Sequence, residues 1–356
     1  MAPICPRPVI TWLAFDAGEI CLGANLPPES GIRVPANALR GLVDALFQKV
    51  GMNTENAGLM AQLLVATDLR GVFSHGTHQT SGYVRMIRDG RVNARPNIEV
   101  TSTTSTTRIY DGDGGMGHLP SWQAANFVAD TAAELGTAAA TTGNHFHFGG
   151  AGKYTRVAAA HDCIGIAISS HRWERQGMIA NGATGASPMS IAIPTSADVP
   201  PLVIDMATRL LPWEEDLFEQ MPFAYFKELG LGSIAHALGG VLAGVWQPGR
   251  MPPTSKWESN QGGFFAAFHI AALCPIDQFR AEMTRYVSEC RQLAPFPGHQ
   301  RAELPGGIEW LNEAEFGRLG IPISEEHESS LQAVADEFGV DTPFAQFEST
   351  RFGAGS

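Results

Sequence analysis

The sequence predicts an α/β protein with helices ahead of the sheet. Three short apolar runs, residues 137–142, 164–169 and 202–204, have the length and composition of buried strands. Glycine-rich loops and a predicted helix over residues 154–161 separate them, and this alternation is typical of an α/β domain. Apolar residues recur at helical spacing between residues 37 and 69, which adds two helices before the first strand.

The other elements follow from local composition. Residues 1–31 hold scattered Pro and Gly without periodicity and are expected to form an extension. The second early helix is expected to begin at Thr54 as its N-cap. The remaining predicted elements are strands within 98–110, a glycine-rich turn at 111–115, helices over 121–135 and 230–245, a loop at 248–261, a strand at 263–271, and helices over 276–293 and from Ser324 or Ser329 to 338.

Composition narrows the functional classes. With 356 residues, of which 44% are hydrophobic, the chain can bury two cores or one large core with an added lobe. Its 24 basic and 36 acidic side chains give a formal charge of −12, which disfavours nucleic acid and anionic membranes as partners. An anionic substrate would therefore need local positive charge at its site.

Cysteine usage and hydropathy indicate the compartment. The five cysteines have no paired spacing, and their odd number leaves at least one thiol outside any intramolecular disulfide. No apolar run approaches the ~20 residues that a membrane-spanning helix needs, and the N-terminus lacks the pattern of a secretory leader. These observations predict a cytoplasmic protein.

The segment Asp68–Gly76 has the composition of a catalytic loop. His75 lies between Ser74 and Gly76, where the hydroxyl can orient the imidazole, and such a histidine can protonate a carbonyl oxygen while hydride reaches the carbon. A loop histidine bonded to backbone is the alternative. Arg70 can bind a carboxylate through a bidentate fork, or it can pair with Asp68 or cap the preceding helix.

A second histidine cluster covers residues 145–152. His145 and His147 are two residues apart and would share one face of an extended strand. Because no carboxylate or Cys follows at ligand spacing, no metal site is predicted, and the favoured interpretation is that one histidine faces a ligand while the other packs. The neighbouring glycines allow close approach of a ligand to the backbone.

Several common motifs are missing from the sequence. Neither residues 149–152 nor residues 111–115 form a Gly-x-Gly-x-x-Gly fingerprint, so a Rossmann domain is not supported. The absence of a Gly-x-Ser-x-Gly elbow and of a Walker loop disfavours hydrolases and NTPases. Lys227 either binds a phosphate or lies along the surface, and Asp205 either reads a ribose hydroxyl or ends a strand.

Taken in order, six segments resemble the malate/L-lactate dehydrogenase family, which includes ureidoglycolate and sulfolactate dehydrogenases, diketogulonate reductase and cyclic imino-acid reductases. The resemblance covers about residues 32–340. The segments are Leu-Arg-Gly to Ser-His-Gly (69–76), Asp-Gly-Asp-Gly-Gly-Met-Gly (111–117), His-Phe-Gly-Gly-Ala-Gly-Lys-Tyr (147–154), Asp-Met-Ala-Thr (205–208), Phe-Lys-Glu-Leu-Gly (226–230) and Leu-Pro-Gly-Gly (304–307).

The resemblance implies a non-Rossmann α/β fold with a central mixed sheet and a helical lobe. After the extension, residues 32–100 would form the helical part of a substrate and dimer domain. Residues 101–247 would form the cofactor-binding α/β domain, and residues 248–356 would pack back on the first domain. Family members are usually dimers, so a homodimer is expected.

The resemblance also assigns roles to residues. His75 becomes the acid/base histidine with Ser74 beside it, and His147 becomes the second histidine of the active site. NAD or NADP would lie against a larger set of residues, namely His171, Asp205, Met206, Ala207, Arg209, Lys227, Pro305 and Gly306. Substrate-binding candidates are Arg70, His78, Gln79 and His145.

The chain departs from the family pattern at two places. Gln79 stands where the family has a carboxylate-binding arginine, so His78, Arg70 or another residue must compensate if the substrate is a simple 2-oxo acid. On the cofactor side, Arg209 replaces a serine and the segment 210–221 is shortened. Larger or different residues also stand at Ala224, Tyr225, Glu228 and Gly307.

The predicted function is hydride transfer between NAD(P) and a small 2-oxo or 2-hydroxy acid, or a related imino acid, with His75 as the proton donor and acceptor. The alternative is a divergent relative that uses the same scaffold and histidines for cofactor-independent isomerase or lyase chemistry.

Overall fold

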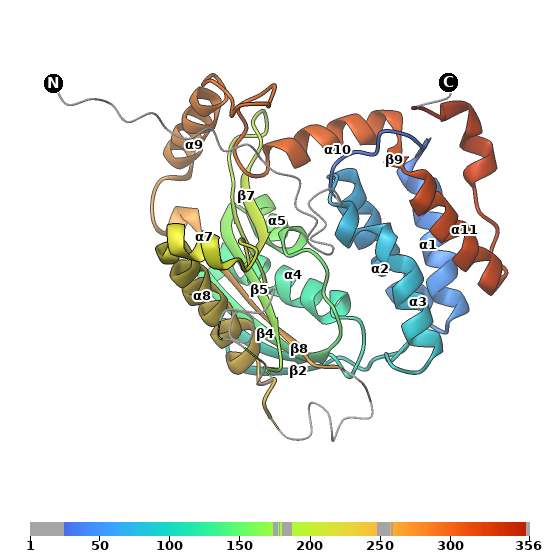
Figure 1. The fold of residues 1–356 in the computed structure, drawn as a ribbon. Helices are drawn as coiled ribbons and strands as arrows, with labels where there is room; N and C mark the ends of the chain where they lie inside the picture. The colour runs from blue at the N-terminus through green and yellow to red at the C-terminus, as the bar shows by residue number, and fades with distance from the viewer. Residues whose placement is uncertain are drawn as a thin grey trace.

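The structure, a computed structural model, forms two lobes side by side (Figure 1). It describes residues 25–173, 177, 179, 187–247, 257 and 259–353, so most of the predicted extension lies outside the described residues. One lobe is built on a large sheet, and the other consists mainly of helices. No helix among the described residues is both long and apolar enough to cross a membrane.

The large sheet has seven strands and is mixed, as predicted. Only β3 and β4 pair in parallel, and every other neighbouring pair is antiparallel. Across the sheet the strands are β2 (Glu99–Thr104), β3 (Thr107–Asp111), β4 (Thr137–His145), β8 (Gln261–His269), β5 (Cys163–His171), β6 (Pro188–Ile193) and β7 (Leu202–Ala207).

The position of β8 differs from the predicted domain boundary at residue 248. This late strand lies in the middle of the sheet, where it pairs with both β4 and β5. Its central residues Phe265, Ala266 and Ala267 are buried, which suits a strand that is covered on both faces. α9 (Ile276–Cys290) also stays with this lobe, since Thr284 Oγ1 accepts a hydrogen bond from the Ser196 amide at 3.2 Å.

Two helices, α4 (His118–Leu135) and α5 (Gly152–Ala160), pack on the sheet and complete its core. Many of the buried residues are alanines, which let helix and sheet approach closely. Three aromatic rings fill the centre, with Tyr154 lying 5.2 Å from Phe148 and 5.6 Å from Phe265 between ring centroids. The Tyr154 hydroxyl donates to the Phe148 carbonyl at 2.5 Å, which fixes the glycine-rich loop between β4 and α5.

The helical lobe has a core of its own. Its first elements are β1 (Ile32–Val34), α1 (Ala36–Lys49), α2 (Thr54–Leu69) and α3 (Thr80–Arg88). The C-terminal elements α10 (Gly307–Leu319), β9 (Ile321–Ile323), α11 (Glu325–Phe338) and the short helix Phe344–Thr350 return to it. β1 and β9 pair antiparallel, so segments from both ends of the described chain close this lobe.

Two predicted helices begin at other residues than expected. The N-cap of α2 is Asn53 and not Thr54, because the Asn53 side chain accepts a hydrogen bond from the Asn56 amide at 2.8 Å. The helix expected at 230–245 is α8 (Pro222–His236), followed by a π-helical turn (Ala237–Leu242). Pro222 starts α8 earlier than predicted, since proline is well accommodated in the first helical turn.

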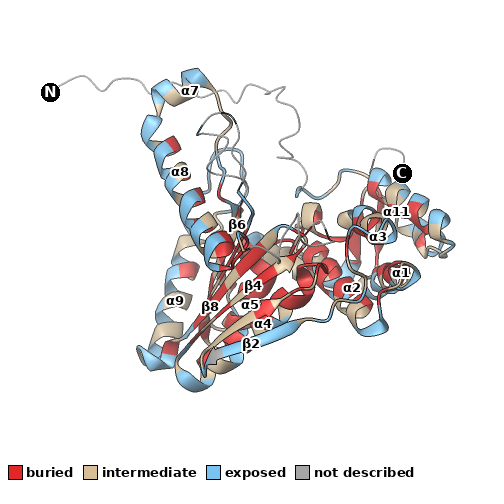
Figure 2. Cartoon of the chain, turned by 90° about the horizontal axis from the view of Figure 1, so that it is seen from below, coloured by how far each residue is buried: buried red, intermediate tan, exposed pale blue. Residues whose placement is uncertain are grey.

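α8 and the short α7 (Glu215–Gln220) stand at one side of the sheet with much of their surface exposed (Figure 2). Several of these exposed side chains are large and apolar. They are Phe223, Phe226 and Ile234 on α8 and Val241, Leu242 and Trp246 after it. An exposed apolar group of this kind is typical of a surface that another protein covers.

Candidate active site

A cavity of about 560 Å³ lies between the two lobes, and seven of the fifteen predicted site residues line it. The sheet lobe contributes the edge where β5 and β7 end and where β6 and β8 begin. The lining residues from this lobe are His147, Gly150, Ser169, Ser170, His171, Pro188, Asp205, Met206, Ala207 and Gln261. Those from the helical lobe are Arg70, Gly71, Val72, His75, Ile308, Glu309 and Asn312, and Asn25 also lines the cavity.

The loop that carries His75 is held by a buried carboxyl. Asp68, in the last turn of α2, is fully buried, and its Oδ2 accepts hydrogen bonds from the Thr77 amide at 3.0 Å and the Thr77 hydroxyl at 2.6 Å. Gly76 makes this closure possible, because a Cβ there would lie 1.6 Å from Asp68 Oδ1. Burial raises the pKa of Asp68 to about 7.

The side chain of His75 is oriented by its neighbour. Ser74 Oγ lies 2.8 Å from Nδ1 of His75, so Nε2 is the ring nitrogen left for a ligand in the cavity. Burial, with a smaller contribution from the charge of Lys153, lowers the pKa of His75 to about 4. At neutral pH the ring is therefore uncharged and is able to accept a proton.

His147 faces His75 from the sheet lobe. The centroids of the two rings are 5.6 Å apart, and the Tyr83 hydroxyl lies 2.6 Å from Nδ1 of His147. Burial lowers the pKa of His147 to about 3, and His75 adds a smaller effect in the same direction. The structure thus brings the two predicted histidines together as neutral rings on opposite walls of one cavity.

Arg70 lines the cavity but already has an anionic partner. Its Nε and Nη2 donate to the carboxylate of Glu313 at 3.2 and 3.0 Å, and Nη1 donates to the Ala66 carbonyl at 3.1 Å. Arg70 therefore pairs with Glu313 and does not pair with Asp68, which was one expected partner. Its bond to the Ala66 carbonyl lies at the end of α2, as expected of a residue that caps this helix. Arg70 is the single Arg or Lys among the described residues that line this cavity.

Three predicted substrate-binding residues lie away from the cavity. His78 is exposed and packs edge-on against His327, and Gln79 donates to the Ser74 carbonyl at 2.7 Å, which braces the loop. His145 is fully buried, with Nε2 2.8 Å from Thr142 Oγ1 and Nδ1 2.7 Å from the Phe146 carbonyl. Both of its ring nitrogens are thus engaged inside the protein, so His145 is the packing member of the pair.

Of the predicted cofactor residues, His171, Asp205, Met206 and Ala207 line the cavity. Asp205 also joins β7 to the N-terminus of α5, since its carboxylate accepts from the amides of Ala151 at 3.2 Å and Gly152 at 2.8 Å. A carboxylate is favourable at a helix N-terminus. Asp205 therefore occupies amides that would otherwise be free to bind an anionic ligand.

Arg209, Lys227, Pro305 and Gly306 do not line the cavity. Lys227 is exposed on α8, with Nζ 5.5 Å from the centroid of the Phe223 ring, and Arg209 is exposed after β7. The turn at Pro305 and Gly306 binds β7 instead, since the Val203 amide donates to the Pro305 carbonyl at 2.9 Å. This contact places the first turns of α10 over the cavity.

The residues that depart from the family pattern hold the shortened segment 210–221. Glu228 is buried, and its Oε2 accepts from the amides of Leu210 at 2.6 Å and Leu211 at 2.7 Å. The Tyr225 hydroxyl donates to the Pro212 carbonyl at 2.6 Å. Tyr225 and Glu228, two of these residues, thus stabilise the short segment.

Several residues of the site were not predicted from the sequence, four of them with polar side chains close to the predicted histidines or on α10. Tyr83 binds His147, and Glu309 and Asn312 line the cavity from α10. Lys153 is buried beside the glycine-rich loop, and its presence among those glycines was the one sequence feature that could have drawn attention to it. Among the described residues no three His, Cys, Asp or Glu side chains are grouped as metal ligands would be.

This geometry agrees with the comparison to known proteins. A family model described as malate/L-lactate dehydrogenase matches residues 34–215 and 214–332, which is most of the chain. The chain belongs to the malate/L-lactate dehydrogenase family. Its membership confirms the resemblance inferred from the motifs and identifies the protein as a member of a dehydrogenase family.

The matches to individual relatives extend over nearly the full length of each relative. The malate dehydrogenase of Pyrococcus abyssi is 27% identical, over 88% of this chain and 96% of the relative. The NAD(+)-dependent ureidoglycolate dehydrogenase of Escherichia coli is 23% identical, over 88% of this chain and 100% of the relative. The solved malate dehydrogenase of Pyrococcus horikoshii is 28% identical with a TM-score of 0.76, over 87% of this chain and 97% of that structure.

Removing the Asp68 carboxyl should change how stability depends on pH. The native protein keeps Asp68 protonated up to a pH of about 7, whereas the unfolded chain ionises it near 3.8. Between these values unfolding releases a proton, so stability is lost as the pH rises. The free energy of unfolding of the wild type relative to Asp68→Asn should fall by about 3 kcal/mol from pH 4 to pH 7.

Urea denaturation at several pH values measures this difference. Asp341→Asn, at an exposed position, is the control and should follow the wild type throughout. Parallel pH curves for the wild type and Asp68→Asn would show that Asp68 is ionised in the native state.

Proposed function

We propose that the protein transfers a hydride between NAD(P) and C2 of a small 2-oxo or 2-hydroxy acid, or the equivalent carbon of a related imino acid, with His75 as proton donor and acceptor. The observation that carries this proposal is the pair of neutral histidines, His75 and His147, facing each other in one cavity. The printed names of the relatives, malate and ureidoglycolate dehydrogenases, support a small hydroxy acid as the substrate.

In the oxidative direction, neutral His75 accepts the hydroxyl proton through Nε2 while the hydride leaves C2. Ser74 keeps the ring in the required orientation through Nδ1. His147, held at Nδ1 by Tyr83, offers Nε2 as a hydrogen-bond partner for the same substrate oxygen. Arg70 supplies the positive charge of the cavity, and we propose that it attracts the substrate carboxylate in place of the arginine that Gln79 replaces.

The cavity residues fit a nicotinamide cofactor. A volume of about 560 Å³ lies in the range of ligand pockets, and the wall formed by Gly150, Ser169 and Ser170 has small side chains that allow a flat ring to approach. When bound, the cofactor supplies or accepts the hydride. We propose that Met206, Ala207 and His171 contact its nicotinamide half. Arg209, Lys227, Pro305 and Gly306 are proposed contacts for its outer half, beyond the cavity.

Cofactor binding is the first test. NADH and NADPH are each titrated into the protein while the melting temperature is followed, because a ligand that binds only the folded state raises stability. We expect at least one of them to raise the melting temperature, and the comparison of the two identifies the cofactor. Free AMP is the control for binding through the adenine half alone. No response to either nicotinamide cofactor would overturn the proposal and favour the cofactor-independent alternative.

Removal of His75 tests the proton-transfer role. His75→Ala should lower kcat by about 10²- to 10⁴-fold, the usual contribution of general acid/base catalysis, and should leave the cofactor Kd nearly unchanged. His299→Ala, an exposed histidine in the loop after α9, is the matched control and should keep wild-type turnover. Turnover that survives in His75→Ala would shift the acid/base role to His147.

We also propose that the protein is a cytoplasmic homodimer, and the exposed apolar side chains of α8 support this assembly. Light scattering should give twice the chain mass of 38.1 kDa. Phe226→Glu places a charge among these side chains and should yield monomers, whereas Leu135→Glu, on half-exposed Leu135 at the end of α4, should not. A wild-type protein that is monomeric at micromolar concentration would contradict the proposal.

A further inference from the structure

Lys153 is a buried lysine that the mechanism above does not use. It follows the glycine-rich loop as the second residue of α5, and only 8% of its surface is exposed. Within the described part of the chain, its Nζ has no hydrogen-bond partner. A buried ammonium without a partner is costly, and burial lowers the pKa of Lys153 to about 7.

Charged and titratable groups surround this amine from every neighbouring element. They are Asp68 and Arg70 at the end of α2, His75 in the loop after it, His118 on α4, His147 after β4, Arg156 on α5, Asp205 on β7 and Glu309 on α10. Asp68 is engaged with Thr77 and Asp205 with the amides of Ala151 and Gly152, while the charge of Glu309 acts on Arg156. Lys153 is therefore not one half of a structural ion pair.

The missing side chain of Gly149 lets the amine reach the histidines. A Cβ on Gly149 would lie 2.8 Å from Lys153 Nζ and 2.6 Å from His118 Nε2. A residue larger than glycine at position 149 would therefore push Lys153 Nζ away from the His118 ring. The positive φ of Gly149, 76°, is a second reason why glycine fits this position.

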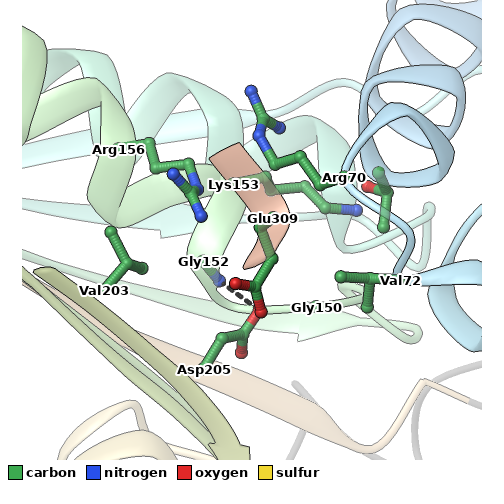
Figure 3. A pocket seen from close by; sticks show the side chains of 10 residues that line it. Arg70, Val72, Gly150, Gly152, Lys153, Arg156, Val203, Asp205 and Glu309 are labelled. Atoms are coloured by element: carbon green, nitrogen blue, oxygen red, sulfur yellow. Dashed lines mark hydrogen bonds between the residues drawn. The ribbon is translucent and has the colours of Figure 1, made fainter. Parts of the chain in front are cut away.

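A small cavity of about 20 Å³ lies beside the main cavity and is lined by Lys153 (Figure 3). Arg156 also lines it from α5, and the two cavities share Arg70, Val72, Gly150, Asp205 and Glu309 as walls. This volume suffices for one water molecule, and the polar walls offer it hydrogen-bond partners. A water in this small cavity can accept a proton from Lys153 Nζ and would lie against the walls that the main cavity, with His75, shares.

The reductive direction needs a proton that the histidines do not hold. Reduction of a carbonyl consumes one hydride and one proton, yet neither His75, with a pKa of about 4, nor His147, with a pKa of about 3, is protonated at neutral pH. Lys153 is the neighbouring cation that gains and loses a proton most readily at this pH, since an arginine stays charged.

We propose that Lys153 is a second proton-carrying residue of this site, which passes to His75 the proton that reduction consumes and receives the proton that oxidation releases. The role rests on the proposed function. In reduction the Lys153 ammonium passes a proton through the water to Nε2 of His75, and His75 gives this proton to the oxygen while the hydride adds to C2. The step ends with a hydroxyl, a neutral His75 and a neutral Lys153 amine, which then regains a proton from solvent.

The protonation of Lys153 is measured without cofactor. The chain has four lysines, at 49, 153, 227 and 256, so the NMR signals of ¹³C-labelled lysine side chains are few. One signal should titrate near pH 7 and should vanish in Lys153→Met, whereas an ordinary lysine titrates at about 10.4. A Lys153 signal that titrates near pH 10 would overturn the proposal.

Kinetics separate proton transfer from a merely structural role. Lys153→Met keeps the side-chain length and should lower kcat for reduction about 10- to 100-fold at neutral pH, with little change in KM. The wild-type fall in reductive kcat as the pH rises through 7 should disappear. Lys153→Arg keeps the charge but cannot release a proton, so it should not restore the rate. Lys49→Met, at an exposed position on α1, is the matched control.

The two proposals fail in different ways. Full reductive turnover and an unchanged pH profile in Lys153→Arg would overturn the role of Lys153 and leave the dehydrogenase intact. A wild-type protein that binds neither NADH nor NADPH would overturn the proposed function, whatever the lysine titration shows. Should Lys153→Met fail to fold, Lys153→Arg and the wild-type NMR titration still decide the question.

Discussion

The buried carboxyl of Asp68 is the contact on which the geometry of the site depends. It binds Thr77 twice and thereby closes the loop over the end of α2, where Gly76 alone leaves room for it. His327 of α11 lies 3.2 Å from the same Thr77 hydroxyl, so a segment 250 residues away supports the loop as well. Ser74 and His75 sit on this loop, and their position relative to the sheet lobe follows from it.

Burial governs the chemistry of the groups around the cavity. It is the largest cause of the shifted pKa of His75, His147, Asp68 and Lys153, and it moves each of them toward the neutral form. Neutral imidazoles accept protons, while a lysine with a pKa near 7 is able to release one. A reversible dehydrogenase needs both abilities at the same pH, and the two lobes supply them by excluding water from one region.

Residues expected to depart from the family pattern contact the backbone of this chain at two separate places. Tyr225 and Glu228 hold the backbone of Leu210 to Pro212, which is the segment that became shorter. Gln79 similarly binds the carbonyl of Ser74 and supports the loop instead of facing a substrate. Both sets of contacts hold backbone segments near the cavity, whose wall includes Asp205, Met206 and Ala207.

Local sequence features determined the elements and the principal residues. The runs at 137–142 and 164–169 predicted β4 and β5 because a strand is encoded by consecutive apolar residues. His75 and His147 were recognised because each lies in a short motif that contains glycine. Only the tertiary structure decided that β8 lies at the centre of the sheet. It also decided that His145 binds Thr142 inside the protein while His147 lines the cavity, and that Lys153 is buried where the two lobes meet. Strand neighbours, hydrogen-bond partners and the burial of a charge all depend on segments far apart in the chain, and no local pattern encodes them.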